Sequence, residues 1–453
     1  MRAAALIASP TDGIGYPVAM YAARRRRFLE ALEPDSVALL LGAGLATRSR
    51  DTHFPFRQDS DFHYLTGFDH PNAAALVRKD GGPPFTLFVE PRDREAEIWN
   101  GYRPGVEGAV ADYGADAAHP IAELVEKLPS LIEGARRVYH VLGRDARVDA
   151  KLTETLEQTR LRSRQGVLPP EAILDPRAIA HEMRLLKEPE ELDVMRRAAE
   201  ISREAHAAAA ALAHEGVYEY ELAAALDYTF RRRGGAGPAY ESIVGGGRNA
   251  TILHYVANDR PLRGGELVLI DAGAEFEGYA SDVTRTYPVG GAFAGGGRAV
   301  YEVVLAAQEA ALERVRPGAT LEDVHDAALR RLVEGLLELR LLEGSVDDAI
   351  GSSAYRRYYM HRTSHWLGLD VHDVGAYTAS GKARPLVPGM VLTVEPGLYV
   401  GADDERAPAA LRGIGVRIED DVVVTDDGCE ILTAEIPKRP GDVEALVRAG
   451  SRR

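Results

Sequence analysis

The segment Leu267-Val-Leu-Ile-Asp271-Ala-Gly-Ala-Glu-Phe-Glu-Gly278-Tyr-Ala-Ser-Asp282-Val-Thr-Arg-Thr-Tyr287 carries two apolar or β-branched runs on either side of a short polar turn. Two such runs around a turn predict a β-hairpin. With the turn centred between Phe276 and Glu277, Asp271 lies opposite Asp282, and directly opposed Cβ atoms are about 4.5–5.5 Å apart. Two carboxylates at this distance repel each other unless a cation lies between them. The alternative interpretation is that both aspartates are ordinary solvated residues of a turn.

A second pair of strands follows the same pattern near the C-terminus. Gly389-Met-Val-Leu-Thr-Val-Glu395 and Gly413-Ile-Gly-Val-Arg417-Ile-Glu419 are apolar runs joined by a loop near residues 401–412. Antiparallel pairing about residue 407 makes Glu395 face Glu419, and Arg417 then shares the sheet face of Glu419 because side chains alternate along a strand. Arg417 can orient these carboxylates or form an ordinary cross-strand ion pair, and the sequence leaves both interpretations open.

The histidines gather in the segment His361-Arg-Thr-Ser-His365-Trp-Leu-Gly-Leu-Asp-Val-His372. A zinc protease of the His-Glu-x-x-His type needs a glutamate after the first histidine, and Arg362 stands there instead. We therefore expect one histidine to bind metal and its neighbours to contact substrate or to move protons. His254 stands alone in an apolar run, where a core position is the simpler interpretation.

These segments contribute five side chains that can bind metal ions. Each stands in or beside an apolar run, where an unpaired acid is costly to bury. Brought together, four carboxylates and one imidazole form an oxygen-rich site suited to two divalent cations. The predicted ligands are Asp271, Asp282, His365, Glu395 and Glu419.

The chain length predicts two domains, because 453 residues are too many for one ordinary core. Strand-like and helix-like segments alternate up to a proline-containing stretch at residues 168–176, which predicts an α/β domain over residues 1–175. Long helices and glycine-separated strands follow in mixed order. They predict an α+β domain over residues 176–453.

The composition limits the partners and the compartment. A net charge of −15 argues against nucleic acid and anionic membrane as main partners. The single cysteine, Cys429, excludes an internal disulfide framework, and no apolar stretch reaches the ~18 residues of a membrane span. Residues 1–8 are too few for a convincing signal peptide, so we expect the cytoplasm. The basic run Arg24–Arg27, in a helix over residues 20–33, is expected to form a solvated face.

Taken together, the motifs resemble those of aminopeptidase P, a family of the pita-bread metallopeptidases. The matching segments are Asp271-Ala-Gly-Ala-Glu, Ser281-Asp-Val-Thr-Arg-Thr, His361 to Gly375, Thr393-Val-Glu-Pro-Gly-Leu-Tyr, Gly415-Val-Arg-Ile-Glu-Asp, Arg57 to Phe68 and Glu97 to Gly101. The resemblance implies a pita-bread (creatinase/aminopeptidase) fold for the C-terminal domain. Many relatives carry Pro-His-Gly where this chain has Met360-His-Arg362, which changes the expected pocket wall.

The resemblance also implies how metal ions are held. Asp271 and Asp282 would bind a first ion, His365 and Glu395 a second, and Asp282 and Glu419 would bridge both. Manganese is implied, and cobalt or zinc can replace it. A hydroxide that bridges the two ions would attack the carbonyl carbon of the first substrate residue, with Glu395 taking and returning its proton.

The same resemblance assigns the pocket and the substrate. His254, His361 and His372 would line the pocket, and Arg417 would lie beside the metals. The implied reaction is release of the N-terminal residue from peptides with proline in second position. A dimer or tetramer is implied, with the N-terminal domain helping assembly and limiting access.

Two other functions fit the same fold. A prolidase would cut only Xaa-Pro dipeptides, and the N-terminal motifs favour the aminopeptidase over it. A metal-free binding protein of this fold would be expected to lose ligands, and all five are present in this chain.

Overall fold

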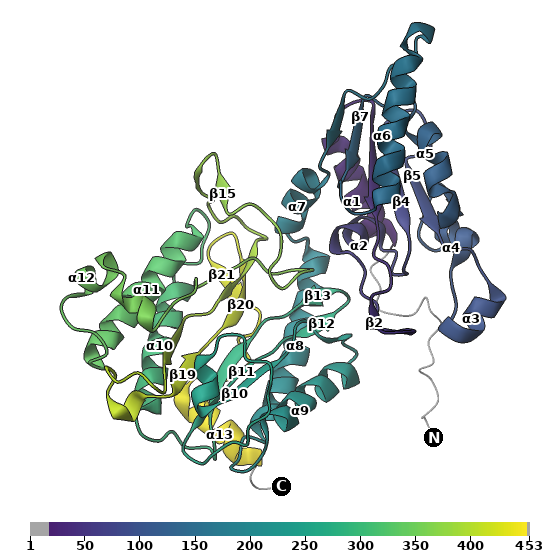
Figure 1. Ribbon diagram of the computed structural model, residues 1–453. Coiled ribbons are helices and arrows are strands. Elements are labelled where there is room, and N and C mark those ends of the chain that lie inside the picture. Colours follow the sequence, from purple (N-terminus) through teal and green to yellow (C-terminus); the bar gives the residue numbers. More distant parts are fainter. Residues whose placement is uncertain (1–17, 451–453) are drawn as a thin grey trace. The chain divides into compact units, whose positions relative to one another are not determined.

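The computed structural model describes residues 18–450, which fall into two compact units, one ending at Met183 and the other beginning at Arg184 (Figure 1). The division falls inside helix α7 (Arg177–Leu185), a few residues after the predicted limit at residue 175. The segment considered as a signal peptide lies outside the described residues. Within residues 18–450, no helix is long and apolar enough to cross a membrane.

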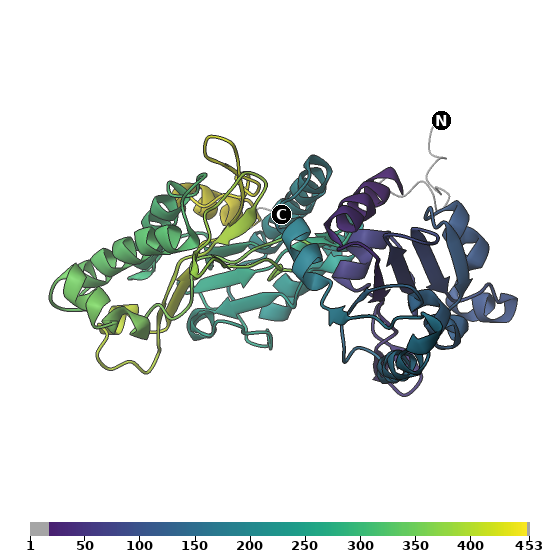
Figure 2. The same ribbon diagram turned by 90° about the horizontal axis from the view of Figure 1, so that it is seen from above.

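The first unit is built on a mixed six-stranded sheet. Its strands are β1 (Ser36–Leu41), β4 (Ala74–Arg78), β5 (Phe85–Val89), β6 (Ala117–Pro120), β7 (Arg137–His140) and β8 (Ala172–Leu174), and its longer helices are α1 (Val18–Ala31), α5 (Leu124–Ile132) and α6 (Ala146–Leu161). The strand order is β6-β5-β4-β1-β7-β8. Helices lie on both sides of the sheet (Figure 2), and apolar side chains of α5 and α6 pack on alternate residues of β1, Val37 and Leu39.

The basic run in α1 departs from its expected solvation. Arg26 and Arg27 are exposed, but Arg24 and Arg25 are buried. The Arg24 guanidinium lies 4.2 Å from the centre of the Tyr64 ring, and that of Arg25 lies 3.8 Å from the centre of the Phe85 ring. Arginine tolerates burial where its apolar stem packs and its charge faces an aromatic ring, so the prediction was wrong for half of the run.

Short antiparallel strands form the sheets of the second unit. They are β9 (Gly237–Pro238), β10 (Ile243–Gly246), β11 (Leu267–Asp271), β12 (Ala274–Phe276), β13 (Tyr279–Ala280), β14 (Thr284–Pro288), β17 (Val391–Val394), β18 (Gly397–Val400), β19 (Ile414–Arg417), β20 (Asp420–Val424) and β21 (Cys429–Ile431). The sheets run β10-β11-β14, β13-β12-β9, β17-β20-β21 and β18-β19, and a further two-stranded sheet pairs β15 (Thr378–Ala379) with β16 (Lys382–Ala383). Helices and such strands in one unit agree with the predicted α+β architecture.

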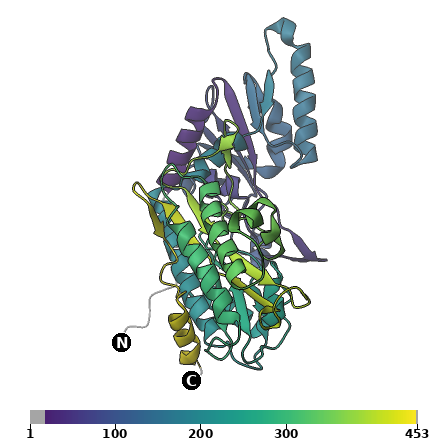
Figure 3. The same cartoon turned by 90° about the vertical axis from the view of Figure 1, so that its left-hand side faces the viewer.

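Four long helices accompany these sheets: α8 (Pro189–Ala210), α9 (Glu219–Arg232), α10 (Gly297–Leu312) and α11 (Leu321–Glu338). Figure 3 shows α10 and α11 side by side in this unit. Thr320 caps α11, since its side chain accepts a hydrogen bond from the Asp323 N–H, as the Thr-x-x-Asp spacing predicts. Apolar residues of both helices pack against Leu392 of β17 and Val422 of β20.

The first hairpin forms, but its predicted register was wrong by one residue at the turn. Glu277 and Gly278 are the central turn residues, with φ of 50° and 80°, as a two-residue turn of this hand requires. Asp271 therefore pairs with Thr284 and not with Asp282. The shift moves the partner by two positions, so Asp282 keeps its side of the hairpin.

The second pair of strands has the predicted register. Val394 pairs with Asp420 in one ladder, and Gly397 pairs with Arg417 in the next. Glu395 and Glu419 lie between these two ladders in the same register and therefore face each other. The turn falls between β18 and β19, in the loop predicted near residues 401–412.

Candidate metal centre and active-site cavity

All nine site residues predicted from the sequence line one cavity of about 1020 Å³ in the second unit. They come from strand ends and loops that are far apart in the chain. The residues are His254, Asp271, Asp282, His361, His365, His372, Glu395, Arg417 and Glu419. The structure therefore brings the acids and histidines of separate segments to a single place.

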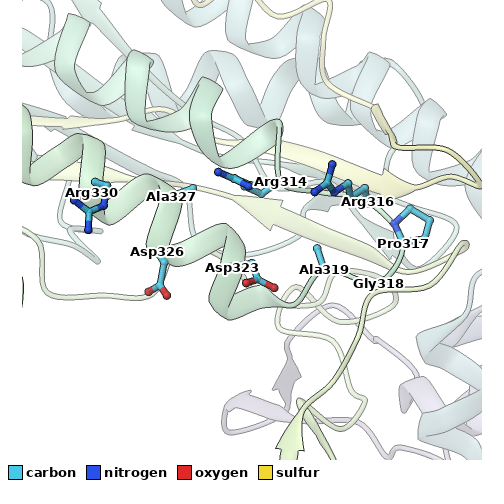
Figure 4. A pocket seen from close by; sticks show the side chains of 9 residues that line it. All are labelled: Arg314, Arg316, Pro317, Gly318, Ala319, Asp323, Asp326, Ala327 and Arg330. Atoms are coloured by element: carbon cyan, nitrogen blue, oxygen red, sulfur yellow. The ribbon is translucent and has the colours of Figure 1, made fainter.

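A second hollow in the same unit has a different chemistry. It lies between the end of α10 and the start of α11 and is lined by charges of both signs from exposed side chains, among them Arg314, Arg316, Asp323 and Asp326 (Figure 4). None of the predicted site residues reaches it. The larger cavity is therefore the candidate functional site.

The two aspartates of the first hairpin meet through a tyrosine. Asp271 is the last residue of β11, and Asp282 lies in the short segment between β13 and β14. The Tyr240 hydroxyl lies 2.6 Å from Asp271 Oδ1 and 2.5 Å from Asp282 Oδ1. Gly273 makes this meeting of strands feasible, because a Cβ there would lie 1.6 Å from the Ser281 carbonyl oxygen. The register error at the turn therefore leaves both carboxylates in the centre.

His365 stands between carboxylates of both hairpins. Its Nε2 lies 3.5 Å from Asp282 Oδ2 and 3.6 Å from Glu395 Oε1. Ligand atoms of Asp282, His365 and Glu419 all lie within 4.8 Å of one another. His365 Nδ1 lies 2.9 Å from the Trp366 carbonyl oxygen, which leaves Nε2 facing the acids.

Arg417 lies beside the carboxylates, as predicted. Its guanidinium donates to Asp271 Oδ2 at 2.5 Å, to Thr284 Oγ1 at 2.9 Å and to the Tyr399 hydroxyl at 2.9 Å. Thr284 in turn donates to Glu419 Oε2 at 2.6 Å. Arg417 is thus more than a cross-strand ion pair, because it orients Asp271 directly and Glu419 through one hydroxyl.

The acids of the centre are held in an environment that opposes their negative charge. Burial, together with the neighbouring carboxylates, raises the pKa of Glu395 to about 7. Burial followed by the charge of Asp282 raises the pKa of Glu419 well above its ordinary range. For His365, burial alone would lower the pKa, but the hydrogen bond to Asp282 and the charge of Glu395 raise it to about 9.

This electrostatic arrangement fits a site for divalent cations. Without positive ions, buried carboxylates must share protons or repel one another. A cation among them would supply the missing charge, and carboxylate oxygens with one imidazole are the donors that such ions accept. Asp271, Asp282, His365, Glu395 and Glu419 therefore fit the metal centre predicted from the sequence.

The remaining predicted histidines form part of the cavity wall. His361 Nε2 lies 2.9 Å from the Tyr399 hydroxyl, and its Nδ1 lies 3.8 Å from Glu395 Oε2. Burial and the charge of Arg417 lower the pKa of His361 to about 4. The His372 ring packs edge-on against His365, with 4.4 Å between ring centres. His254 is exposed toward the cavity, so its interpretation as a core residue was wrong.

Three contacts of the centre were missed from the sequence. Tyr240 precedes β10 in a loop, and no local pattern marks it. Thr284 follows Asp282 by two residues, so its place on the same strand face was a readable signal. Asp421 accepts hydrogen bonds from the Ser281 hydroxyl at 2.8 Å and from the Asp282 N–H at 3.1 Å, and thereby fixes the turn that carries Asp282.

Known proteins resemble this chain over nearly its whole length. Metallopeptidase family M24 matches residues 193–426, and the aminopeptidase P N-terminal domain matches residues 21–139. The chain is 45% identical to the Xaa-Pro aminopeptidase of Escherichia coli K12, over 94% of this chain and 97% of that protein.

Solved structures also resemble this chain over nearly its whole length. Aminopeptidase PepP of Pseudomonas aeruginosa has a TM-score of 0.94 and 46% identity, covering 97% of this chain and 100% of its own. Zn-substituted E. coli aminopeptidase P in complex with product has a TM-score of 0.92 and 44% identity, covering 96% and 99%. These matches confirm the pita-bread fold implied by the motifs. The chain belongs to metallopeptidase family M24 and carries the N-terminal domain of aminopeptidase P.

Proposed function

We propose that this chain is a metalloaminopeptidase that releases the N-terminal residue from peptides with proline in second position. The observation that carries the proposal is the convergence of all five metal-binding side chains, three histidines and Arg417 in one cavity. The relative at 45% identity bears the name of this activity. Every site residue predicted from the sequence lines this cavity.

We further propose two divalent ions at this centre. Asp271 and Asp282 would hold one ion, His365 and Glu395 the other, and Asp282 and Glu419 both. The oxygen-dominated donor set favours manganese, with cobalt or zinc as substitutes. When bound, such ions lower the pKa of a water molecule and polarise a carbonyl group.

The protein's own groups supply proton transfer and charge stabilisation. Glu395 is proposed to take a proton from the attacking water and return it to the leaving nitrogen, because its carboxylate stands at the centre, 3.8 Å from His361 Nδ1 and 3.6 Å from His365 Nε2. His361 and His254 are proposed to stabilise the developing oxyanion. The position of His361 beside Glu395 keeps it at the centre.

Proline in second position sets a specific demand on the enzyme. The peptide bond before proline has no N–H, so peptidases that bind their substrate through that N–H cleave this bond poorly. We propose that His372, beside His365 at the cavity wall, contacts the carbonyl after the scissile bond. A site that holds the free α-amine at the metal centre would limit cleavage to one residue.

The same reasoning gives a second candidate function, an expected oligomeric state and an expected compartment. A prolidase would use the same centre but accept only dipeptides. We also propose a homo-oligomer, dimer or tetramer, in which the unit ending at Met183 helps assembly and limits access. The cytoplasm is the proposed compartment.

The test is peptide hydrolysis by protein stripped with EDTA and then supplied with Mn²⁺. Substrates of two to nine residues carry either proline or alanine in second position. We expect metal-dependent release of the first residue from the proline series at several lengths, and its loss in Glu395→Gln but not in Glu405→Gln, an exposed loop residue. Cleavage of dipeptides alone would favour the prolidase, and no cleavage with any metal would refute the proposal.

A further inference from the structure

Arg362 is an exposed cation on the wall of the active-site cavity. It follows His361 directly in the chain. Its side chain is 64% exposed, and its closest acid within residues 18–450 is Glu322 at 3.9 Å, itself 66% exposed. An ion pair that long and that open to water contributes little, so the guanidinium is available to another anion.

The other arginine that lines the cavity, Arg417, already has hydrogen-bond partners. Arg417 is 4% exposed and donates hydrogen bonds to Asp271, Thr284 and Tyr399. The histidines at the centre face the predicted metal ligands. Among the cavity-lining residues that the structure describes, Arg362 is thus the arginine that can still pair with a ligand.

The surroundings make one exposed cation important. The chain carries a net charge of −15, and Glu241 adds an acid to the cavity wall beyond the metal centre, where Asp370 is already paired with Arg184. A substrate carboxylate entering this cavity meets a repulsive field unless a cation stands near its path. Arg362 supplies that cation, and guanidinium groups bind carboxylates well because both are planar and can form paired hydrogen bonds.

The position of Arg362 in the chain indicates which end of the substrate it meets. His361 lies 3.8 Å from Glu395 and so marks the reacting end, whereas Arg362 points toward Glu322 at the start of α11. A peptide extends by about 3.3–3.6 Å per residue, so the residue after proline begins roughly 7 Å beyond the first. The groups that reach the cavity wall are therefore those after the proline.

We infer that Arg362 is a specificity-determining residue that binds a carboxylate of the peptide on the C-terminal side of the scissile bond. The inference rests on the proposed function and adds a substrate class to it. The carboxylate is either the free C-terminus of a tripeptide or an acidic side chain that follows proline. Peptides with such a group should be cleaved faster than neutral ones of the same length.

Four peptides separate the two sources of the carboxylate. Ala-Pro-Gly is compared with its amide, and Ala-Pro-Glu-amide with Ala-Pro-Gln-amide. In the manganese-loaded wild-type protein we expect kcat/KM to be about two- to fivefold higher for the acidic member of at least one pair, the range for a solvent-exposed ion pair. The pair that shows the preference identifies the source.

Three variants tie the preference to this side chain. Arg362→Gln should bring the ratio to about one while cleavage of the neutral peptides continues. Arg356→Gln removes an exposed arginine that does not line the cavity and should keep the wild-type ratio. Glu322→Gln removes the competing acid and should raise the ratio. Calorimetric binding of Pro-Gly and Pro-Gly-amide gives a readout that needs no turnover, and only Arg362→Gln should lose the difference.

The results distinguish this inference from the proposed function. If the wild-type protein cleaves all four peptides with no preference for acid, or if Arg362→Gln keeps the preference, the inference is refuted and the proposed function stands. If the wild-type protein releases alanine from none of them, the proposed function itself is refuted, and the inference falls with it.

Discussion

Replacing Arg417 by methionine tests whether the carboxylate centre depends on one buried positive charge. Arg417 is 4% exposed, and its guanidinium donates to Asp271, Thr284 and Tyr399. Methionine keeps much of the volume but removes the charge and all three hydrogen bonds. Asp271 would then face Asp282 across the Tyr240 hydroxyl with no arginine to balance them.

The expected loss can be worked from this geometry. Removing one partner of a buried ion pair costs about 3–5 kcal/mol, because the other charge stays buried without compensation. For a domain of this size, 1 kcal/mol shifts the melting temperature by about 2–4 °C, which gives a decrease of roughly 6–20 °C. The decrease applies to the metal-free protein, in which Arg417 is the cation that pairs with Asp271 among residues 18–450.

The assay is thermal unfolding in EDTA and again in Mn²⁺. We expect the gain in melting temperature on adding Mn²⁺ to be larger for Arg417→Met than for the wild type, since the ions replace part of the lost charge. Arg412→Met is the matched control, because Arg412 is exposed and donates only to the loop carbonyls of Ala407 and Glu405. A metal-free Arg417→Met that melts with the wild type, or an equal gain from Mn²⁺, would refute the reasoning.

The remaining predictions concern the centre itself. Asp282→Ala and Glu419→Ala should each abolish peptide hydrolysis and lower the bound metal measured by elemental analysis, and turnover like that of the wild type would contradict their shared role. His361→Ala should keep its metal but lower kcat by about 10²–10³-fold, as loss of an oxyanion donor does; lost metal would instead make it a ligand. Tyr240→Phe should lower metal affinity about 10–100-fold, measured by titration with Mn²⁺. In EDTA, the unfolding free energy of the wild type should fall relative to that of Glu395→Gln as pH rises from about 5 to 7, because the folded pKa of Glu395 is about 7 against an ordinary 4.5 and the folded state keeps a proton that the unfolded chain releases; a difference between the two proteins that stays constant over this range would contradict the raised pKa.

The sequence predicted much of the site because local periodicity carries long-range information in a hairpin. For the second pair of strands, the two apolar runs fixed the register, and Glu395 faces Glu419 as expected. For the first hairpin, the position of the turn depended on which two residues adopt positive φ. Glu277 does so beside Gly278, although glutamate seldom occupies that conformation.

Other features depend on tertiary packing that no short segment reveals. Tyr240 reaches Asp271 and Asp282 from a loop before β10, and nothing in its own neighbours indicates this contact. Arg24 and Arg25 were expected in water because a run of four arginines is usually solvated. Their burial depends on Tyr64 and Phe85, which come from elements much later in the chain.

Three consecutive acids show how the fold gives similar side chains different tasks. Glu419 faces the cavity and lies with Asp282 and His365. Asp420 points the other way, where buried Arg285 donates to it at 2.7 Å and Lys438 also pairs with it, so its charge is neutralised within the core. Asp421 supports the turn of Asp282. Glu419 directly precedes β20 and Asp420 begins it, and the pairing of Arg285 with Asp420 shows that Glu419 is the one available to a metal ion. Arg285 and Lys438 thus neutralise Asp420, an acid outside the centre. Inside the centre, Arg417 and His365 balance only part of the negative charge of the four carboxylates, and divalent ions would balance the rest.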